Sequence, residues 1–168
     1  MSSFGVIEKL RKDHQLDDFD CGKPGLNDFL KRHARQNQQN NSSVTYVLAN
    51  DLEVGAYYSL AVGSVTHTEA TAAVTKRLSR YYPVPILLLA RLAVTKALQG
   101  RRIGEALLKD AFQRAAATSD VVGIAAFVVH AMDEEAKAFY LRYDFEESPT
   151  DPLHLFIPMK DIHASLPK

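Results

Sequence analysis

A nearly continuous apolar run over 86–94 constrains the fold of this chain more than any other feature. The run is rich in branched residues and carries one charge, Arg91. Such a pattern is typical of a central strand that is buried on both faces. A short turn with Gly100 and Gly104 follows and leads directly into an amphipathic helix near Ile103. This order of strand, turn and helix predicts an α/β domain built around the strand.

The rest of the chain supplies further strands and helices. Asn50 and Asp51 form a short turn that is expected to join two strands into a hairpin. A helix is expected to begin near Pro24, since proline favours the first helical turn. The strands are predicted over 6–10, 44–49, 54–65, 121–130 and 153–159, and the other helices over 71–80 and 133–143. Because no repeat or linker divides the sequence, we expect one domain over residues 1–168 with a mixed sheet and helices packed on its faces.

Composition excludes several classes of protein. Cys21 is the only cysteine, which excludes an intrachain disulfide and argues against a zinc cluster, so we expect no metal. The amino terminus is too polar for a signal peptide, and no apolar run is long enough to cross a bilayer. We therefore expect a cytoplasmic protein without a membrane partner. The formal net charge of +0 argues against indiscriminate binding of nucleic acid.

The charges are nevertheless unevenly distributed. Every charged residue between 76 and 102 is basic, and so is every charged residue between 29 and 50, whereas acids gather between 133 and 151. An asymmetry of this kind favours a polyanionic ligand at one face. A solvated basic surface without a ligand is the alternative that the charges alone leave open.

The glycine turn after the central strand is a candidate anion site. Backbone N–H groups and the positive end of the helix dipole favour an anion at such a junction. Gly100 and Gly104 allow phosphate oxygens to approach the backbone, and Gln99, Arg101 and Arg102 add donors. The spacing fits neither a Walker loop nor G-x-G-x-x-G. A glycine turn that binds nothing is the alternative.

Two motifs resemble those of the GNAT acetyltransferase superfamily. The segment 99–106 is similar to its pyrophosphate signature, [Q/R]-x-x-G-x-[G/A]; Gln99 and Gly104 match, and Arg102 stands where glycine is usual. The segment 135–145 resembles A-x-x-F-Y-x-x-x-G-F, with Asp144 in place of the glycine. The resemblance covers nearly the whole chain in element order. It implies the GNAT fold, a mixed central sheet splayed at the central strand with helices on both faces.

A narrower resemblance is to the GNAT toxins of bacterial toxin–antitoxin pairs. It is carried by the segments 19–22, 26–30, 58–65, 85–86 and 89–94. These toxins acetylate the α-amino group of aminoacyl-tRNA and so block translation. The resemblance therefore implies acetyl-CoA as the acetyl donor, aminoacyl-tRNA as the substrate, a ribbon-helix-helix antitoxin and a homodimer.

The resemblance also assigns roles to residues. Backbone groups of Leu92 and Val94 would hold the pantetheine arm, with an N–H facing the thioester carbonyl. Tyr140 would give a proton to the departing thiolate, because tyrosine, with a pKa near 10, is protonated at neutral pH. The expected acetyl-CoA-binding residues are Leu92, Ala93, Val94, Gln99, Gly100, Arg101, Arg102, Ile103, Gly104, Glu105 and Phe139. The expected tRNA-binding residues are Arg32, Arg35, Lys76, Arg77, Arg80 and Arg91.

Several of these residues also have a structural interpretation, and a few others are weaker catalytic candidates. By position alone Tyr140 is a core tyrosine, and Tyr143 is its nearby competitor, which we interpret as packing. His130 and His67 end strands and are weaker candidates for a base, and Cys21 shows no activating partner. Arg91 should pair with an acid or reach towards the acceptor, and the toxins, which carry an arginine there, favour the second.

Two other functions also fit the sequence. One is a GNAT enzyme acting on a small amine or a protein amino group. The other is a catalytically weak acetyl-CoA-binding regulatory subunit, which the replacements at Arg102 and Asp144 would favour. The central strand offers no carboxylate base, which fits an α-amine acceptor, since this amine is largely neutral near pH 8 whereas a lysine amine is charged.

Overall fold

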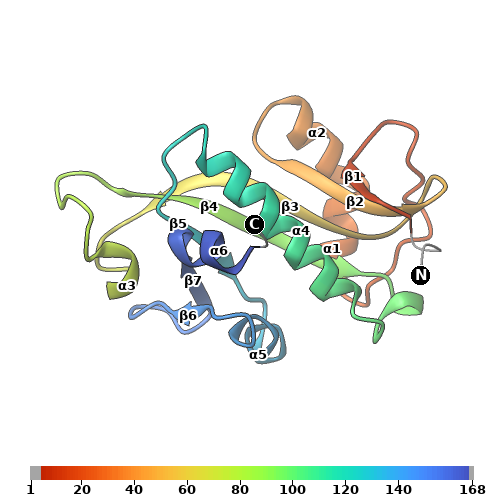
Figure 1. The fold of residues 1–168 in the computed structure, drawn as a ribbon. Coiled ribbons are helices and arrows are strands. Elements are labelled where there is room, and N and C mark those ends of the chain that lie inside the picture. Colours follow the sequence, from red (N-terminus) through yellow and green to blue (C-terminus); the bar gives the residue numbers. More distant parts are fainter. Residues whose placement is uncertain (1–4, 167–168) are drawn as a thin grey trace. The chain divides into compact units, whose positions relative to one another are not determined.

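A computed structural model describes residues 5–166 of the chain, and its β-strands and α-helices are labelled in Figure 1. The chain forms two compact units. Unit 1 consists of Met1–Ala61 with Ala90–Ala111, and unit 2 of Val62–Leu89 with Phe112–Lys168. Three elements run through both units: β3 (Glu53–Val65), β4 (Val84–Val94) and α4 (Ile103–Ser119).

The other elements belong to one unit each. Those of unit 1 are β1 (Ile7–Lys9), α1 (Pro24–Asp28), the π-helix η2 (Phe29–His33), α2 (Ala34–Gln39), β2 (Val44–Asn50) and the 3-10 helix η3 (Lys96–Leu98). Those of unit 2 are α3 (Ala72–Thr75), β5 (Ala126–His130), α5 (Glu134–Leu141), β6 (Glu146–Glu147), β7 (His154–Pro158) and α6 (Met159–Ser165).

The strands form a mixed seven-stranded sheet in the order β1-β2-β3-β4-β5-β7-β6, which confirms the predicted α/β class. β4 and β5 pair in parallel, whereas β1 and β2, β2 and β3, β5 and β7, and β6 and β7 pair antiparallel. The ladder between β4 and β5 runs from Ile86↔Ala126 to Leu89↔Val129. Since β4 continues to Val94, its last part lies beyond this ladder, as expected of a sheet that splays at its central strand.

The predicted hairpin is confirmed in unit 1. The register of β2 and β3 closes at Asn50↔Glu53, and Asp51 in the turn has a φ of 55°. Aspartate tolerates this left-handed conformation better than most residues because its short side chain hydrogen-bonds locally. A bulge between Leu48 and Ala49 adjusts the register of the two strands.

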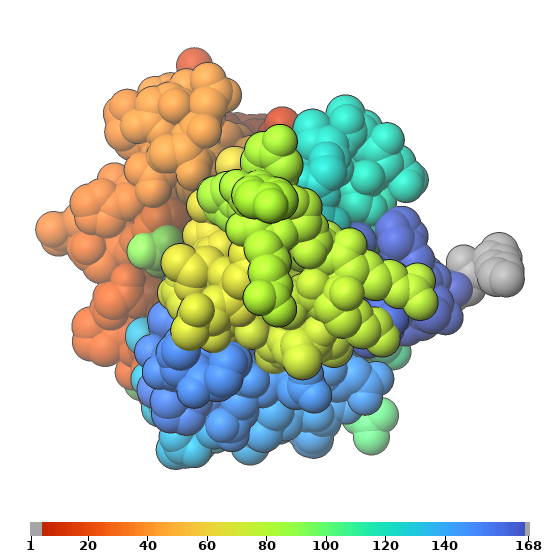
Figure 2. Space-filling view, turned by 90° about the vertical axis from the view of Figure 1, so that its left-hand side faces the viewer, coloured from red at the N-terminus to blue at the C-terminus, as the bar shows by residue number. Residues whose placement is uncertain are grey.

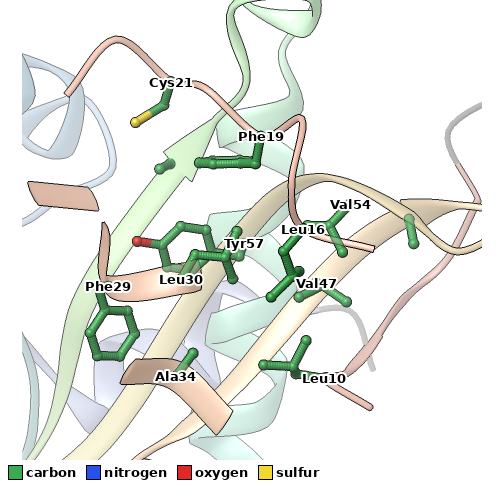
Figure 3. Close-up of a cluster of buried hydrophobic side chains, with 12 residues drawn as sticks. Leu10, Leu16, Phe19, Cys21, Phe29, Leu30, Ala34, Val47, Val54 and Tyr57 are labelled. Atoms are coloured by element: carbon green, nitrogen blue, oxygen red, sulfur yellow. The ribbon is translucent and has the colours of Figure 1, made fainter. Parts of the chain in front are cut away.

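A core of buried side chains holds α1, η2 and α2 against the strands of unit 1 (Figure 3). Its largest member, Tyr57, meets Phe19 edge-on, with the ring centroids 5.5 Å apart, and stacks on Phe29, with the ring centroids 6.2 Å apart. The Tyr57 hydroxyl donates to the Leu26 carbonyl at 2.7 Å, so the buried polar atom has a partner. Pro24 opens the helical stretch, as predicted.

Unit 2 has a separate aromatic cluster. The ring centroid of Phe127, on β5, lies 5.7 Å from that of Phe112, on α4, and 6.3 Å from that of Phe145. Phe145 also meets the Tyr140 ring of α5 at 5.5 Å, nearly edge-on. The helix α5 begins with a cap, because Asp133 Oδ1 accepts from the Ala136 N–H at 2.8 Å. This cluster and cap fix the position of Tyr140 in the unit.

Several predicted element bounds are wrong. The helix predicted over 71–80 is only Ala72–Thr75, because the chain turns at the basic residues that follow. The strand predicted over 121–130 begins at Ala126, and Val121 is 82% exposed. β6 and α6 were not predicted, because a two-residue strand has no sequence pattern and the last strand was expected to continue to Met159. Among residues 5–166 no helix is both long enough and apolar enough to cross a membrane.

Candidate active site

The predicted anion site lies in unit 1, where β4 passes through η3 into α4. Gly100 has a φ of 82° and Arg102 a φ of 62°, so the turn uses the left-handed region twice. A Cβ on Gly100 would meet no atom within 4 Å, so the backbone there is open to an approaching ligand. The first N–H groups of α4, from Ile103 onwards, have no acceptor within the helix, and the helix dipole makes this end positive.

Gln99 secures this turn from the inside. Its side-chain amide donates to the carbonyl of Val94 at 2.9 Å and to the carbonyl of Cys21 at 3.0 Å. The Nε2 group is therefore engaged on the backbone, and its role in the structure is to hold the turn to the end of β4. The neighbouring Lys96 N–H donates to the Asp20 carbonyl at 2.8 Å, which ties η3 to the same loop.

These residues fit the pyrophosphate of coenzyme A. Arg101 and Arg102 are exposed beside the open backbone of Gly100, and Ile103 is buried and anchors the start of α4. Leu92 and Val94 are half-buried and Ala93 is buried, in the part of β4 that extends beyond the β4–β5 ladder. An extended backbone of this kind can hold a pantetheine amide as a neighbouring strand would. Glu105 lies on the outer side of α4, 3.4 Å from Lys109.

The two replacements of glycine in the motifs both have left-handed backbones. Arg102 has a φ of 62° in unit 1, and Asp144 has a φ of 72° in unit 2. Glycine adopts this region freely, whereas other residues incur a cost of about 1–2 kcal/mol. The chain thus keeps the backbone conformation that the glycine of each motif allows. The replacements therefore give no support to a catalytically weak subunit with a collapsed turn.

Arg91 is arranged in a way that the sequence did not suggest. Its guanidinium carbon lies 3.8 Å from the centroid of the Phe29 ring, which in turn stacks on Tyr57. A cation over an aromatic face is stabilised by the ring quadrupole, so the half-buried charge is compensated without an acid. The arginine signal in an apolar strand was visible in the sequence, but its partner, far away on η2, was not.

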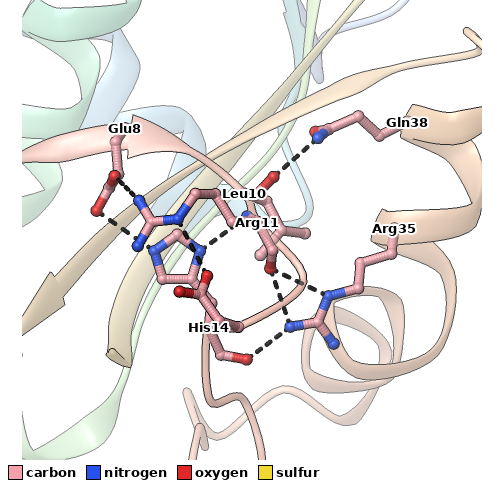
Figure 4. Close-up of polar contacts among 7 residues, drawn as sticks. Glu8, Leu10, Arg11, His14, Arg35 and Gln38 are labelled. Atoms are coloured by element: carbon pink, nitrogen blue, oxygen red, sulfur yellow. Dashed lines mark hydrogen bonds and ion pairs between the residues drawn. The ribbon is translucent and has the colours of Figure 1, made fainter. Parts of the chain in front are cut away.

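The other two predicted tRNA-binding arginines of unit 1 have structural contacts. Arg35 donates to the carbonyls of Arg11 at 3.2 Å and His14 at 2.6 Å, and so holds the loop after β1 (Figure 4). Arg32 is exposed on η2 and pairs with Asp28 at 3.1 Å, one helical turn earlier. An exposed pair of this kind contributes little to stability, and Arg32 keeps its solvent access.

Tyr140 lies on α5 in unit 2 and is only 6% exposed. Its ring packs edge-on against Phe139 at 5.1 Å and Phe145 at 5.5 Å. The buried Tyr57 and Tyr58 hydroxyls have acceptors, Leu26 O and Asp110 Oδ2. By contrast, no atom of residues 5–166 forms a hydrogen bond with the Tyr140 hydroxyl. Burial raises the pKa of Tyr140, so the hydroxyl holds its proton at neutral pH and above.

Unit 2 holds three of the predicted tRNA-binding residues and a further cation, Lys160, that was not predicted. Lys76, Arg77 and Arg80 are all exposed in the segment after α3. Lys160, on α6, is exposed as well, and its positive charge, with that of Arg77, lowers the pKa of Lys76. A like charge nearby disfavours the charged form of an ammonium, which is why the pKa falls. Lys160 falls in a sequence region with acids, so no local pattern marked it.

His130 of β5 has a partner that the sequence did not show. It lies opposite His154 of β7 in the ladder, and the two rings stack at 3.8 Å with an interplanar angle of 16°. Burial and the nearby His154 lower the pKa of His130, while Asp151 and Glu69 act in the opposite direction. His154 itself lies 3.3 Å from the Asp151 carboxylate.

This pair predicts acid sensitivity. With a lowered pKa in the folded state, His130 binds a proton more tightly in the unfolded chain, so stability falls as pH drops below about 6.5 and stops falling below the lowered pKa. His130→Asn should therefore show a smaller loss of urea stability between pH 7.5 and pH 5.5 than the wild type. His154→Asn removes the like charge that lowers the pKa of His130, so it should also reduce the loss of urea stability. An unchanged pH dependence in His130→Asn would refute this assignment.

The remaining candidates have ordinary structural surroundings. His67 Nε2 lies 2.9 Å from the Tyr82 carbonyl, and the ring of Tyr143 packs on Phe139 at 5.2 Å. Cys21 is buried, with its thiol 3.6 Å from the Lys23 carbonyl. In the described part of the chain, no three His, Cys, Asp or Glu side chains are grouped so as to hold a metal ion.

Comparison with known proteins agrees with these features. Residues 41–147 match the family model described as "Acetyltransferase (GNAT) domain". The tRNA-acetylating toxin of Mycobacterium tuberculosis (strain ATCC 25618 / H37Rv) is 41% identical over 98% of this chain and 98% of its own length.

Solved structures are similar over nearly the whole chain. A tyrosine-to-phenylalanine mutant of KacT superposes with a TM-score of 0.89 at 29% identity, covering 96% of this chain and 98% of that one. AtaT complexed with acetyl-methionyl-tRNAfMet superposes with a TM-score of 0.86 at 30% identity, covering 95% of this chain and 97% of that one. A mutant AtaT toxin bound to the C-terminus of the antitoxin AtaR and acetyl-CoA superposes with a TM-score of 0.80 at 30% identity, covering 95% of this chain and 96% of that one.

The family model thus covers more than half of the chain, and a relative is 41% identical over 98% of it. This chain belongs to the GNAT acetyltransferase family.

Proposed function

We propose that this protein transfers the acetyl group of acetyl-CoA to the α-amino group of an aminoacyl-tRNA and thereby blocks translation. The observation that carries the proposal is Tyr140, a buried tyrosine in the family's Phe-Tyr motif whose hydroxyl is unused within the described fold. The open turn at Gly100, with its arginines, supports a coenzyme A pyrophosphate. The similarity to a tRNA-acetylating toxin supports the acceptor.

Acetyl transfer to an α-amine needs few catalytic groups at the acceptor. A new amide bond forms between the amine nitrogen and the acetyl carbon, the carbon–sulfur bond breaks, and the amine loses a proton while the sulfur gains one. Acetyl-CoA supplies the activated thioester. A backbone N–H of the Leu92–Val94 stretch would stabilise the oxyanion, and the Tyr140 hydroxyl would donate to the departing sulfur. A neutral α-amine needs no dedicated carboxylate base.

The acceptor can be tested directly. Radiolabelled acetyl-CoA is offered together with charged bulk tRNA, uncharged tRNA, polyamines and a lysine peptide in parallel reactions. We expect label on charged tRNA only, because the amine of an amino ester is largely neutral near pH 8 and the other amines are charged. Mild alkali should then release labelled N-acetyl amino acid, whose chromatographic identity names the amino acid that is chosen.

Two results would contradict this acceptor. Label on uncharged tRNA would move the acetyl group to the nucleic acid itself. Efficient labelling of the polyamines or the peptide would favour the small-amine or protein acetyltransferase and remove the link with translation. Expression of the chain alone should arrest growth, and normal growth with abundant folded protein would also count against the proposal.

We further propose that the protein acts in the cytoplasm as a homodimer that a ribbon-helix-helix antitoxin holds inactive, and that its two units form one acetyltransferase domain over 1–168. The antitoxin complex of AtaT supports such a partner. The family match over 41–147 includes parts of both units, which supports a single domain. Light scattering at micromolar concentration would test the dimer, since a monomer has half the expected mass.

A further inference from the structure

The segment of residues 76–82 in unit 2 combines exposed basic and aromatic side chains. Tyr81 is 92% exposed and Tyr82 is 71% exposed, whereas Tyr57 and Tyr58 of the core are 0% exposed. Neither exposed tyrosine belongs to the buried cluster of unit 2. Figure 2 shows the yellow and yellow-green chain of residues 62–89 facing the viewer, beside the blue chain after residue 130.

The backbone of the segment is nevertheless held in place. Leu78 packs against the buried cluster around Val84 and Phe156. The Tyr82 carbonyl lies 2.9 Å from His67 Nε2, and the Tyr81 N–H donates to Ser79 Oγ at 3.2 Å. The tyrosine rings are therefore presented to solvent from a fixed backbone, which lowers the entropy cost of binding a flat partner.

Charge around the tyrosines selects the partner. No acid occurs between Glu69 and Glu105 in the sequence. The basic patch is defined here as the three exposed cations of this segment together with the exposed Lys160, whose charge acts on Lys76: Lys76, Arg77, Arg80 and Lys160. Such a patch attracts phosphates, whereas an aromatic face accepts an unpaired base by stacking. A patch with both features is typical of surfaces that bind single-stranded nucleic acid.

We propose that Tyr81 and Tyr82 form a stacking surface for unpaired bases at the 3′ end of the tRNA substrate, with the basic patch contacting the adjoining phosphates. This inference rests on the proposed function. In a tRNA the amino acid is carried by the single-stranded 3′ end, so unpaired bases always accompany the reacting amine. Bases inside the acceptor stem are stacked on their neighbours and cannot use the tyrosine faces.

The test compares two tRNAs and two double variants of the full-length protein. Fluorescence anisotropy measures the affinity for uncharged tRNA and for the same tRNA without its last four 3′ nucleotides. Tyr81→Ala with Tyr82→Ala should weaken binding of intact tRNA about tenfold or more. The same variant should bind the trimmed tRNA as well as wild type does. Tyr81→Phe with Tyr82→Phe keeps the rings and should bind both tRNAs like wild type.

Salt dependence separates stacking from phosphate contact. The alanine pair should leave the slope of log affinity against log salt unchanged, whereas Arg80→Gln should reduce that slope by about one. Unchanged acetyl-CoA affinity in the alanine pair would show that it is folded.

Three outcomes would overturn the inference. The alanine pair could bind intact tRNA like wild type, or lose affinity for intact and trimmed tRNA alike. It could also lose only the antitoxin, which would assign the tyrosines to a protein partner. If wild-type protein acetylates charged tRNA and the alanine pair binds tRNA without a defect, this inference is wrong and the proposed function stands. Wild-type protein that neither binds nor acetylates tRNA would sink the proposed function with it.

Discussion

Tyr140→Phe should lower kcat for acetyl transfer by at least about 100-fold, the loss typical of removing a general acid or its hydrogen bond. The substitution deletes the hydroxyl alone. The ring contacts with Phe139 and Phe145 remain, and the hydroxyl has no partner among residues 5–166 that would be left unpaired. We therefore expect an unchanged urea midpoint and an unchanged Kd for acetyl-CoA. Single-turnover transfer to charged tRNA measures the chemical step.

Tyr143→Phe is the matched control, since it removes a hydroxyl from the same stretch of chain and keeps the ring contact with Phe139. Its kcat should stay close to that of the wild type. A large loss in Tyr143→Phe with an active Tyr140→Phe would exchange the two assignments. Equal and small losses in both would remove tyrosine from the mechanism.

The raised pKa of Tyr140 also constrains the pH profile. A coenzyme A thiol, with a pKa near 8.5, is a stronger acid than a tyrosine whose pKa burial has raised. The hydroxyl should therefore act mainly as a hydrogen-bond donor to the departing sulfur, and stay protonated up to pH 10. The rate should rise from pH 6 to about 8 as the acceptor amine loses its proton and then level off. A decline between pH 8 and pH 9.5 would contradict this state of Tyr140.

Much of the fold follows from patterns that are local in the sequence. β4 and α4 were predictable because a continuous apolar run marks the strand, and an amphipathic period after the short glycine turn marks the helix. The strand predicted from residue 121 failed because Val121 and Val122 are apolar yet exposed, 82% and 50%. Apolar residues at the end of a run look the same in the sequence whether they are buried or exposed. The π-helix Phe29–His33 has no signal distinct from an α-helix.

The site was predictable only where a motif is contiguous. The turn 99–104 and Tyr140 each lie in one short segment, so the sequence alone was enough to propose them as site residues. Arg91 over Phe29 and His130 on His154 depend on strands and helices that meet only after folding. The exposure of Tyr81 could not be inferred either, because a tyrosine next to a hydrophobic strand normally packs.

Arg102 offers the sharpest test of the anion site. It is the residue before α4, its carbonyl accepts from the Ala106 N–H at 3.2 Å, and its φ is 62°. Asparagine and aspartate tolerate this conformation better than other side chains apart from glycine. Arg102→Asn and Arg102→Asp therefore keep the turn, have nearly the same shape, and differ from each other by one charge.

Folding and ligand binding should respond to that charge in opposite directions. An acid at the start of a helix is favoured by the helix dipole, so Arg102→Asp should be at least as stable in urea as Arg102→Asn. A bound pyrophosphate would instead be repelled. Two unit charges about 6 Å apart in water interact by about 0.7 kcal/mol, and each of the two phosphates carries one charge.

Calorimetric titration with acetyl-CoA should consequently give a Kd about tenfold weaker for Arg102→Asn than for wild type, and about 100-fold weaker for Arg102→Asp. Higher salt should shrink both ratios, because the charges are exposed and screened. Equal Kd values for the two variants would mean that the ligand's phosphates do not lie at this turn. A Kd that weakens together with the urea midpoint would instead mean that the turn has been disrupted, since a charge effect on an intact turn leaves folding unharmed.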